Sequence, residues 1–431
     1  MKRIAAVLGL MLVAAALFLG AAAPPRSLAI VGATVHPMTG KEIAGATVLV
    51  VDGKITGIGE RLSIPAGTER VDAAGKHLFP GFIDADSVLG LTEVGSVRGT
   101  VDEREAGNVN PNLRPELAIN PDSELIPVAR ANGVLHVRAA ARGGLVNGTS
   151  ALIRLDGWTW HDLVAAAPLA LQVEWPAMRI DRRPEARVRP PIQQERIDER
   201  IRALKEAFVT ARAYVKSRDA AAAGQGPAVP ADARWEAMRP VLERKIPVVV
   251  EANDLVQIEA SVAWAEAEGV RMILSGGADA WRAADQLAAK EIPVILGASL
   301  ALPARSWEPY DTAYANAAKL HAAGVRLCLS TGGSGFEAAN TRNLPYQAAM
   351  AEAFGLPHDE AVRAITRYPA EILGVSDRLG TIEAGRSASL ILTDGDPLDI
   401  RTQVLRAWID GREQDLTSRH TRLYERYKAR P

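Results

Sequence analysis

Short apolar runs alternate with helical patterns over residues 79–381, and this alternation constrains the fold more than any other feature of the chain. A short apolar run followed by a helical segment is typical of a βα unit, in which a helix covers a buried parallel strand. The candidate strands span residues 79–84, 133–139, 151–155, 169–175, 246–251, 271–275, 292–296 and 325–330. Eight such units predict an α/β protein built as a (β/α)8 TIM-type barrel.

The length of this region predicts an insertion in the barrel. Residues 79–381 comprise 303 residues, whereas a barrel of this kind typically takes about 250. The excess falls at residues 176–230, where an arginine- and proline-rich loop precedes a charged helical stretch at 193–218 and a flexible linker at 220–230. We therefore expect a helical insertion at 176–230.

Both ends of the chain carry β patterns that match each other. Apolar alternation on either side of Asp52-Gly53 is the strongest short-range signal for a hairpin. Apolar runs at 389–393 and 404–409 follow near the other end, and the second one leads into Asp410-Gly411. Residues 26–78 plus 382–431 are thus predicted to form one small composite β-sandwich domain, with a surface helix or arm at 417–430.

The N-terminal residues have the pattern of a targeting segment. Lys2 and Arg3 precede an apolar stretch at 4–19 and a run of alanines that ends at Ala23. This pattern is typical of a secretory signal peptide over residues 1–23, and it predicts a periplasmic protein. The alternative is an uncleaved anchor, because residues 4–23 are just long enough to span a bilayer. Contact with a membrane is expected only through this segment, and only if it is not cleaved.

Charge and cysteine content exclude several classes of partner and site. The formal net charge is −1, so nothing favours binding to nucleic acid or to an anionic membrane surface. The single cysteine, Cys328, lies in an apolar run. An intrachain disulfide and a cysteine-based metal site are therefore excluded, and a buried, inert thiol is expected.

Several stretches together resemble one family. They are Pro80-Gly81-Phe82-Ile83-Asp84 at the first predicted barrel strand, residues 247–254 at the fifth, and residues 368–374 and 379–390 on the return to the β domain. In this order they resemble the imidazolonepropionase-like branch of the amidohydrolase superfamily. The resemblance implies hydrolysis of a non-peptide C–N bond in a small-molecule substrate, with one or two divalent metals that polarise the carbonyl and generate hydroxide.

The metal ligands that this resemblance implies are largely replaced. The family uses a His-x-His pair after strand one, Lys or Glu at strand four, His at strands five and six, and Asp at strand eight. The matching positions here are Asp86 and Val88, Glu174, Glu251, Ser275 or Gly276, and Gly332. None of the seven histidines falls at the C-terminal end of a predicted strand. Although the family implies a divalent metal, we predict no metal-ligating residue and no cofactor.

Asp86, Glu174 and Glu251 are the candidate catalytic residues, because each lies at the end of a predicted strand. As oxygen donors they would suit Mg²⁺, Ca²⁺ or Mn²⁺ better than zinc. They could instead form an acid–base pair if crowding raises the pKa of one carboxyl. In the third reading each acid neutralises a nearby arginine or caps a helix.

Four further residues are candidates for contact with a substrate: Asn253, Thr331, Arg342 and Asn343. Asn253-Asp254 could equally be the N-cap of a helix that begins near residue 255. Thr331 opens a glycine-rich loop whose backbone amides could cradle an anion. Arg342 could reach the pocket or pair with an acid in a loop.

Two functions remain open from the sequence. One is an exported amidohydrolase-related hydrolase with an atypical or lost metal site. The other is a catalytically inactive barrel that acts as a ligand-binding protein or as the partner subunit of an active homologue, with homo-oligomerisation a further possibility.

Overall fold

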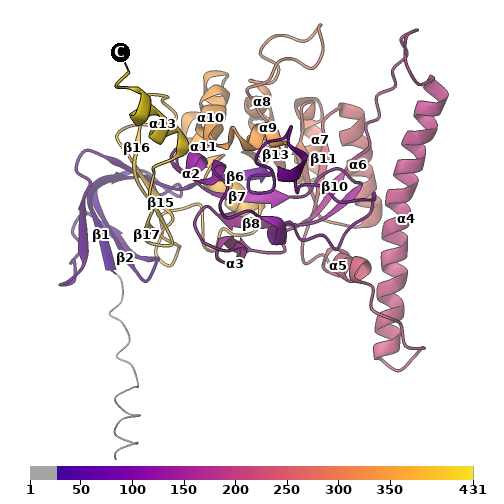
Figure 1. The fold of residues 1–431 in the computed structure, drawn as a ribbon, viewed down its shortest axis with the longest axis horizontal. Coiled ribbons are helices and arrows are strands. Elements are labelled where there is room, and N and C mark those ends of the chain that lie inside the picture. The colour runs from indigo at the N-terminus through magenta and orange to yellow at the C-terminus, as the bar shows by residue number, and fades with distance from the viewer. Residues whose placement is uncertain (1–26, 431) are drawn as a thin grey trace, which may run out of the picture.

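The computed structural model describes residues 27–430, so the signal peptide predicted over residues 1–23 lies outside the described range. The protein is a TIM-type barrel with an additional β domain beside it (Figure 1). Within residues 27–430, no helix is both long enough and apolar enough to cross a membrane.

The additional domain contains one eight-stranded sheet that unites the two ends of the chain. Its strands are β1 (Ser27–Val35), β2 (Ile43–Val51), β3 (Lys54–Gly59), β4 (Glu69–Asp72), β5 (His77–Pro80), β15 (Leu390–Thr393), β16 (Val404–Ile409) and β17 (Arg412–Glu413). The junction between the two ends is the antiparallel pairing of β5 with β15. Ile30, Val48 and Trp408 are among the buried side chains of its core.

The barrel sheet contains a strand within or overlapping each of the eight predicted runs. Its strands, with the short β9 (Val164–Ala166) paired to β8, are β6 (Phe82–Ser87), β7 (Val134–Ala140), β8 (Val146–Arg154), β10 (Leu171–Glu174), β11 (Val248–Ala252), β12 (Met272–Gly276), β13 (Val294–Leu296) and β14 (Leu327–Leu329). β6 and β14 are the two ends of the sheet order. The backbone carbonyls of Ile365 and Ala364 accept hydrogen bonds from Ile83 and Leu329, both 2.9 Å long, and so link these two strands.

The third barrel strand corrects the expectation of eight parallel βα units. β8 begins at Val146 rather than at residue 151, and it runs antiparallel to both of its neighbours, β7 and β10. Only five residues, 141–145, connect β7 to β8. A parallel pair needs a crossover of a dozen residues or more, so a connection this short forces the chain to reverse direction.

Helices cover the outside of the barrel and the edges of its mouth. They are α2 (Leu125–Arg130), α3 (Trp160–Leu163), α4 (Pro190–Ala222), α5 (Ala233–Leu242), α6 (Leu255–Glu268), α7 (Ala284–Ala289), α8 (Asn316–Ala322), α9 (Gly335–Ala338), α10 (Leu344–Ala353), α11 (His358–Arg363), α12 (Arg367–Ile372) and α13 (Arg419–Tyr427). Short 3₁₀ turns lie at Arg98–Thr100, Pro115–Ala118, Ala280–Arg282 and Thr341–Asn343. α13 is the surface helix expected near the C-terminus.

The insertion forms a single long helix, α4, at the far side of the molecule from the β domain (Figure 1). It extends beyond both ends of the helix expected at 193–218. Its buried face includes Leu204, Phe208 and Ala211. The Phe208 ring packs edge-on against Trp264 of α6, with ring centroids 5.0 Å apart. This apolar contact holds the insertion against the barrel.

Candidate functional site

The candidate acids lie at the carboxyl ends of the barrel strands. Asp86 is near the end of β6, Glu174 is the last residue of β10, and Glu251 is in β11. Glu174 and Glu251 are register partners on neighbouring parallel strands, and Ser275 of β12 is the next partner of Glu251. Barrel active sites gather at this face, so the three acids share one mouth.

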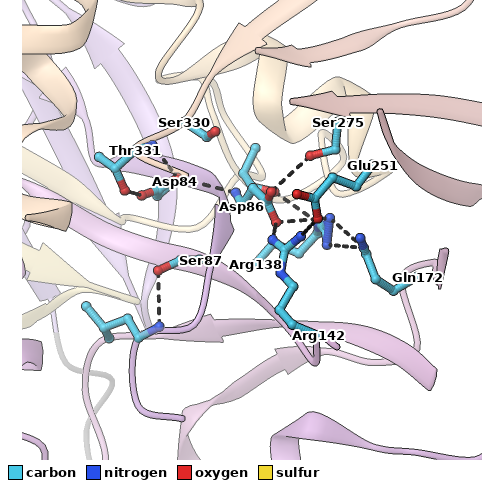
Figure 2. Close-up of polar contacts among 12 residues, drawn as sticks. Asp84, Asp86, Ser87, Arg138, Arg142, Gln172, Glu251, Ser275, Ser330 and Thr331 are labelled. Carbon is cyan, nitrogen blue, oxygen red and sulfur yellow. Dashed lines mark hydrogen bonds and ion pairs between the residues drawn. The ribbon is translucent and has the colours of Figure 1, made fainter. Parts of the chain in front are cut away.

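Arg142 occupies the centre of this mouth. It lies in the short connection between β7 and β8, and its guanidinium binds the carboxylates of Asp86 and Glu251 at the same time, through Nη2 and Nη1 respectively (Figure 2). The Arg142 side chain is only 7% exposed. One cation thus joins acids from the first and fifth strands.

Asp86 has two further partners. The Ser275 hydroxyl donates a 2.9 Å hydrogen bond to its Oδ2 atom. The guanidinium of Arg138, in β7, lies 3.4 Å from its Oδ1 atom and is fully buried. Arg138 also donates to the backbone carbonyl of Ala85 at 2.9 Å and to the side-chain oxygen of Gln172 at 3.1 and 3.2 Å (Figure 2).

The surroundings shift the pKa values of Asp86 and Glu251 in opposite directions. Burial by itself would raise the pKa of Asp86, but the charges of Arg142 and Arg138 outweigh it and the pKa of Asp86 lies below its ordinary value. For Glu251 burial prevails, the nearby charges of Asp86 and Glu174 act in the same direction, and its pKa is raised despite Arg142. Asp86 is therefore firmly ionised, whereas Glu251 holds a proton more readily.

Glu174 completes the group of three acids without joining the guanidinium bridge. Its carboxylate accepts a 3.2 Å hydrogen bond from the backbone N–H of Gly143, the residue after Arg142. The connection between β7 and β8 thus contacts all three predicted acids, through the Arg142 side chain and the Gly143 backbone.

Thr331 lies deeper in the barrel, where it binds Asp84. Its hydroxyl and its backbone N–H both donate to the Asp84 carboxylate, the latter at 3.2 Å, and the N–H of Asp86 adds a 3.3 Å bond (Figure 2). Burial raises the pKa of Asp84 to about 7, against these hydrogen bonds. Thr331, two residues after β14, therefore ties the end of that strand to β6.

The other three predicted contact residues lie away from the Arg142 bridge. Asn253 lines a small cavity of about 130 Å³ beside Asp279 and Asn316, at the ends of β11 to β13. The guanidinium of Arg342 contacts His420 of α13 at 3.2 Å. Asn343 is the N-cap residue of α10, and its side chain donates to Asn340 at 3.4 Å.

The residues at the mouth do not fit the divalent metal that the resemblance implies. Asp86 and Glu251 are already bound by a guanidinium, and Ser275 donates a proton toward Asp86. Val88 is apolar and buried, and Gly332 has no side chain. Among residues 27–430, no group of three or more His, Cys, Asp or Glu side chains is placed to hold a metal ion.

The residues that organise this site, Arg138, Arg142 and Gln172, were not among the candidates from the sequence. One signal was present: Arg138 is a charged residue inside the otherwise apolar strand 134–140, and a buried charge needs a partner. Which acids it would meet depends on the course of β8, which the sequence pattern did not reveal.

Comparison with known proteins agrees with the fold. The family model for the amidohydrolase family matches residues 210–418. The chain is 27% identical to imidazolonepropionase of Acidiphilium cryptum (strain JF-5) over 396 residues, which cover 85% of this chain and 90% of that enzyme. A match at 37% identity to amidohydrolase tasK of Hapsidospora irregularis spans only 75 residues, 17% of this chain and 8% of that protein.

A solved amidohydrolase structure is similar to this protein over most of the chain. The crystal structure of an amidohydrolase from Thermotoga maritima MSB8 superimposes with a TM-score of 0.80 at 28% sequence identity. The superposition covers 90% of this chain and 99% of the other. The chain belongs to the amidohydrolase superfamily, in its imidazolonepropionase-like branch.

Proposed function

We propose that this protein is an exported amidohydrolase-fold protein that has lost metal-dependent hydrolysis and acts by binding. The observation that carries this proposal is the bridge from Arg142 to Asp86 and Glu251. It occupies the acids that stand where the superfamily places metal ligands on strands one and five.

The chemistry of a guanidinium supports this proposal. In metal-assisted hydrolysis the cation polarises the substrate carbonyl and lowers the pKa of bound water to near neutrality. A guanidinium has neither an open coordination position nor an accessible proton equilibrium, because its pKa lies far above neutral pH. The two acid neighbours raise the pKa of Arg142 further, against the effect of burial. Arg142 can hold the acids in place, but it cannot generate hydroxide.

Exposed apolar side chains near the mouth support a binding role. Leu302, Trp307 and Tyr310, in the connection between β13 and α8, are 85%, 67% and 73% exposed, and Phe336 after β14 is 78% exposed. Exposed apolar surface of this kind is typical of interaction sites. It favours binding of a ligand or of a partner subunit over a role as an isolated structural domain.

Metal analysis of the mature protein tests the proposal. Protein purified without chelator is expected to contain no stoichiometric divalent metal by mass spectrometry, before or after soaking with Zn²⁺, Mn²⁺ and Mg²⁺. It is also expected to leave a panel of amides, cyclic amides and dipeptides uncleaved. Near-stoichiometric metal that disappears in Asp86→Ala/Glu251→Ala would overturn the proposal.

Export is tested separately. The segment 1–23 supports secretion by its basic start, apolar stretch and alanine-rich end. N-terminal sequencing of protein recovered from the periplasm is expected to begin at Pro24, and a chain that keeps Met1 would point instead to an uncleaved anchor.

A second candidate is hydrolysis by acid–base catalysis without a metal. The register pairing of Glu174 with Glu251, together with the raised pKa of Glu251, favours it. Glu251 would protonate a leaving nitrogen while Glu174 activates water. Activity on the same panel that persists in chelator and is lost in Glu251→Gln would establish this mechanism.

A further inference from the structure

We propose that Arg142 is a built-in substitute for a metal cation, and that removing its side chain would leave the carboxylates of Asp86 and Glu251 free to bind a cation in its place. This inference rests on the proposed metal-independent function and adds to it the physical role of one residue.

The first argument is geometric. Asp86 and Glu251 come from β6 and β11, which are separated in the sheet by β7, β8 and β10. Both carboxylates nevertheless bind the same planar group, the guanidinium of Arg142 (Figure 2). In a barrel, a group that contacts two strands that are not neighbours must lie across the mouth, and not against the sheet on one side. Their facing oxygens therefore stand on either side of one positive charge.

The second argument is that the surroundings are shaped for the guanidinium. A Cβ atom on Gly333, in the loop after β14, would lie 1.8 Å from Nη2 of Arg142. Any side chain there would displace the guanidinium. The neighbouring Gly332 stands where the superfamily places its strand-eight aspartate, so that acid is absent from the side of the mouth that Arg142 fills.

The third argument is that the position of Arg142 is fixed from outside the bridge. Its backbone N–H donates a 2.7 Å hydrogen bond to the carbonyl of Glu103. On the other side, the N–H of Gly143 binds Glu174 at 3.2 Å. These two backbone bonds fix the point from which the Arg142 side chain extends into the mouth.

The fourth argument concerns charge. Without Arg142, Arg138 would be the remaining positive partner of Asp86 among the contacts within the described chain, and Glu251 would lose its cationic partner. An unpaired buried carboxylate is costly; the Asp86 carboxylate is buried, whereas the Glu251 side chain is 32% exposed. Oxygen atoms in such a group suit Ca²⁺ or Mn²⁺, which accept carboxylate ligands at about 2.1–2.6 Å. When the Arg142 guanidinium is removed, the space between the two carboxylates should therefore bind a cation.

Calorimetric titration and thermal melting of Arg142→Ala test this inference, with Ca²⁺, Mn²⁺ and dilute guanidinium as probes. We expect saturable binding and a rise in melting midpoint of about 2–4 °C at saturating probe. We expect neither in the wild type, nor in the matched double variant Arg142→Ala/Glu251→Gln. An Arg142→Ala protein that folds but responds to these cations no more than the wild type would overturn the inference.

A second set of variants covers the case in which Arg142→Ala does not fold. Arg142→Met keeps much of the side-chain volume but removes the charge, and it is compared with Arg142→Met/Asp86→Asn/Glu251→Gln. If the guanidinium serves to neutralise the two acids, the triple variant should melt higher than Arg142→Met. If the triple variant is no more stable than Arg142→Met, Arg142 acts by packing. That result would refute the proposal that Arg142 takes the place of a metal cation.

These outcomes are separable from failure of the proposed function. Metal or hydrolysis in the wild type would refute the proposed function. A metal-free, inactive wild type whose Arg142 variants show neither cation binding nor charge rescue would refute only the inference about Arg142.

Discussion

The backbone of Gly333 lies directly against the guanidinium of Arg142, so that a Cβ atom at position 333 would stand 1.8 Å from Nη2 and 2.3 Å from Cζ. Gly333→Ala therefore forces Arg142 out of its bridge. We expect a loss of about 3 kcal/mol or more in the free energy of unfolding, because both carboxylates lose a buried partner. Urea denaturation measures the change.

Gly95→Ala is the matched control, because a Cβ atom at Gly95 meets no other atom within 4 Å. Its unfolding free energy should stay within about 0.5 kcal/mol of the wild type. If Gly333→Ala were equally neutral, the guanidinium would have room to move and the contact would not constrain it.

Arg138 gives a second prediction, because it is a fully buried cation. Arg138→Met should destabilise the protein by about 3–5 kcal/mol, since it leaves Gln172 without its donor and removes one of the two charges beside Asp86. Arg401→Met is the control, because Arg401 is 86% exposed and pairs with Asp399 at the surface. Such a pair contributes about 0–1 kcal/mol. If both variants lost the same free energy of unfolding, burial would not be the reason that Arg138 stabilises the protein.

Asp84 gives a prediction about pH. Its pKa of about 7 in the folded state lies above the ordinary value of 3.8. Between these values the folded protein holds a proton that the unfolded chain has released, so the contribution of Asp84 to stability falls as pH rises from about 4 to 7. The slope is about 1.4 kcal/mol per pH unit. Asp84→Asn removes this slope.

The stability of Asp84→Asn relative to the wild type should therefore increase with pH over this window, measured by urea denaturation at pH 4.5, 6 and 7.5. Asp181→Asn is the control. Its Arg183 partner lowers the pKa of Asp181 to about 2, so Asp181 is ionised throughout this window. A pH-independent difference between Asp84→Asn and the wild type would show that Asp84 is ionised in the folded protein.

The barrel could be predicted from the sequence because its strands are short apolar runs, and burial on both faces leaves that signal in parallel strands. β8 escaped the pattern for a physical reason. Its first half contains Asn147, Gly148, Thr149 and Ser150, which are polar or small and yet buried. Runs of this kind are normally read as loops, so the strand was placed too late and in the wrong direction.

The same limit explains what was missed at the mouth. Asp86, Glu174 and Glu251 could be placed at the mouth from the sequence because each lies at the end of a strand, and position along a strand is visible in sequence. Their partner was not, because Arg142 reaches them only through the reversal between β7 and β8. Arg342 and Asn343 were expected near the mouth from their distance to Thr331 along the chain. The turn at Thr341–Asn343 leads them instead toward α10 and α13.

The connection between β13 and α8 gives the last prediction, because Arg305 bonds it to two acids at the ends of β11 and β12. Arg305 donates to Asp279 at 2.7 and 2.5 Å and to Asp254 at 3.1 Å, and it also pairs with Glu308. Asp254 is the N-cap of α6, so these bonds tie the connection to the end of β11. Arg305→Ala should release the segment that carries Trp307 and Tyr310.

Limited proteolysis with chymotrypsin measures this release, because Trp307 and Tyr310 are exposed aromatic residues of the kind that chymotrypsin cleaves after. Cleavage near these residues should be several times faster in Arg305→Ala than in the wild type, since proteolysis follows local opening. Arg326→Ala is the control, because Arg326 is exposed and contacts a backbone carbonyl at 3.5 Å. Equal cleavage rates in Arg305→Ala and Arg326→Ala would show that the connection is held by its apolar contacts and not by Arg305.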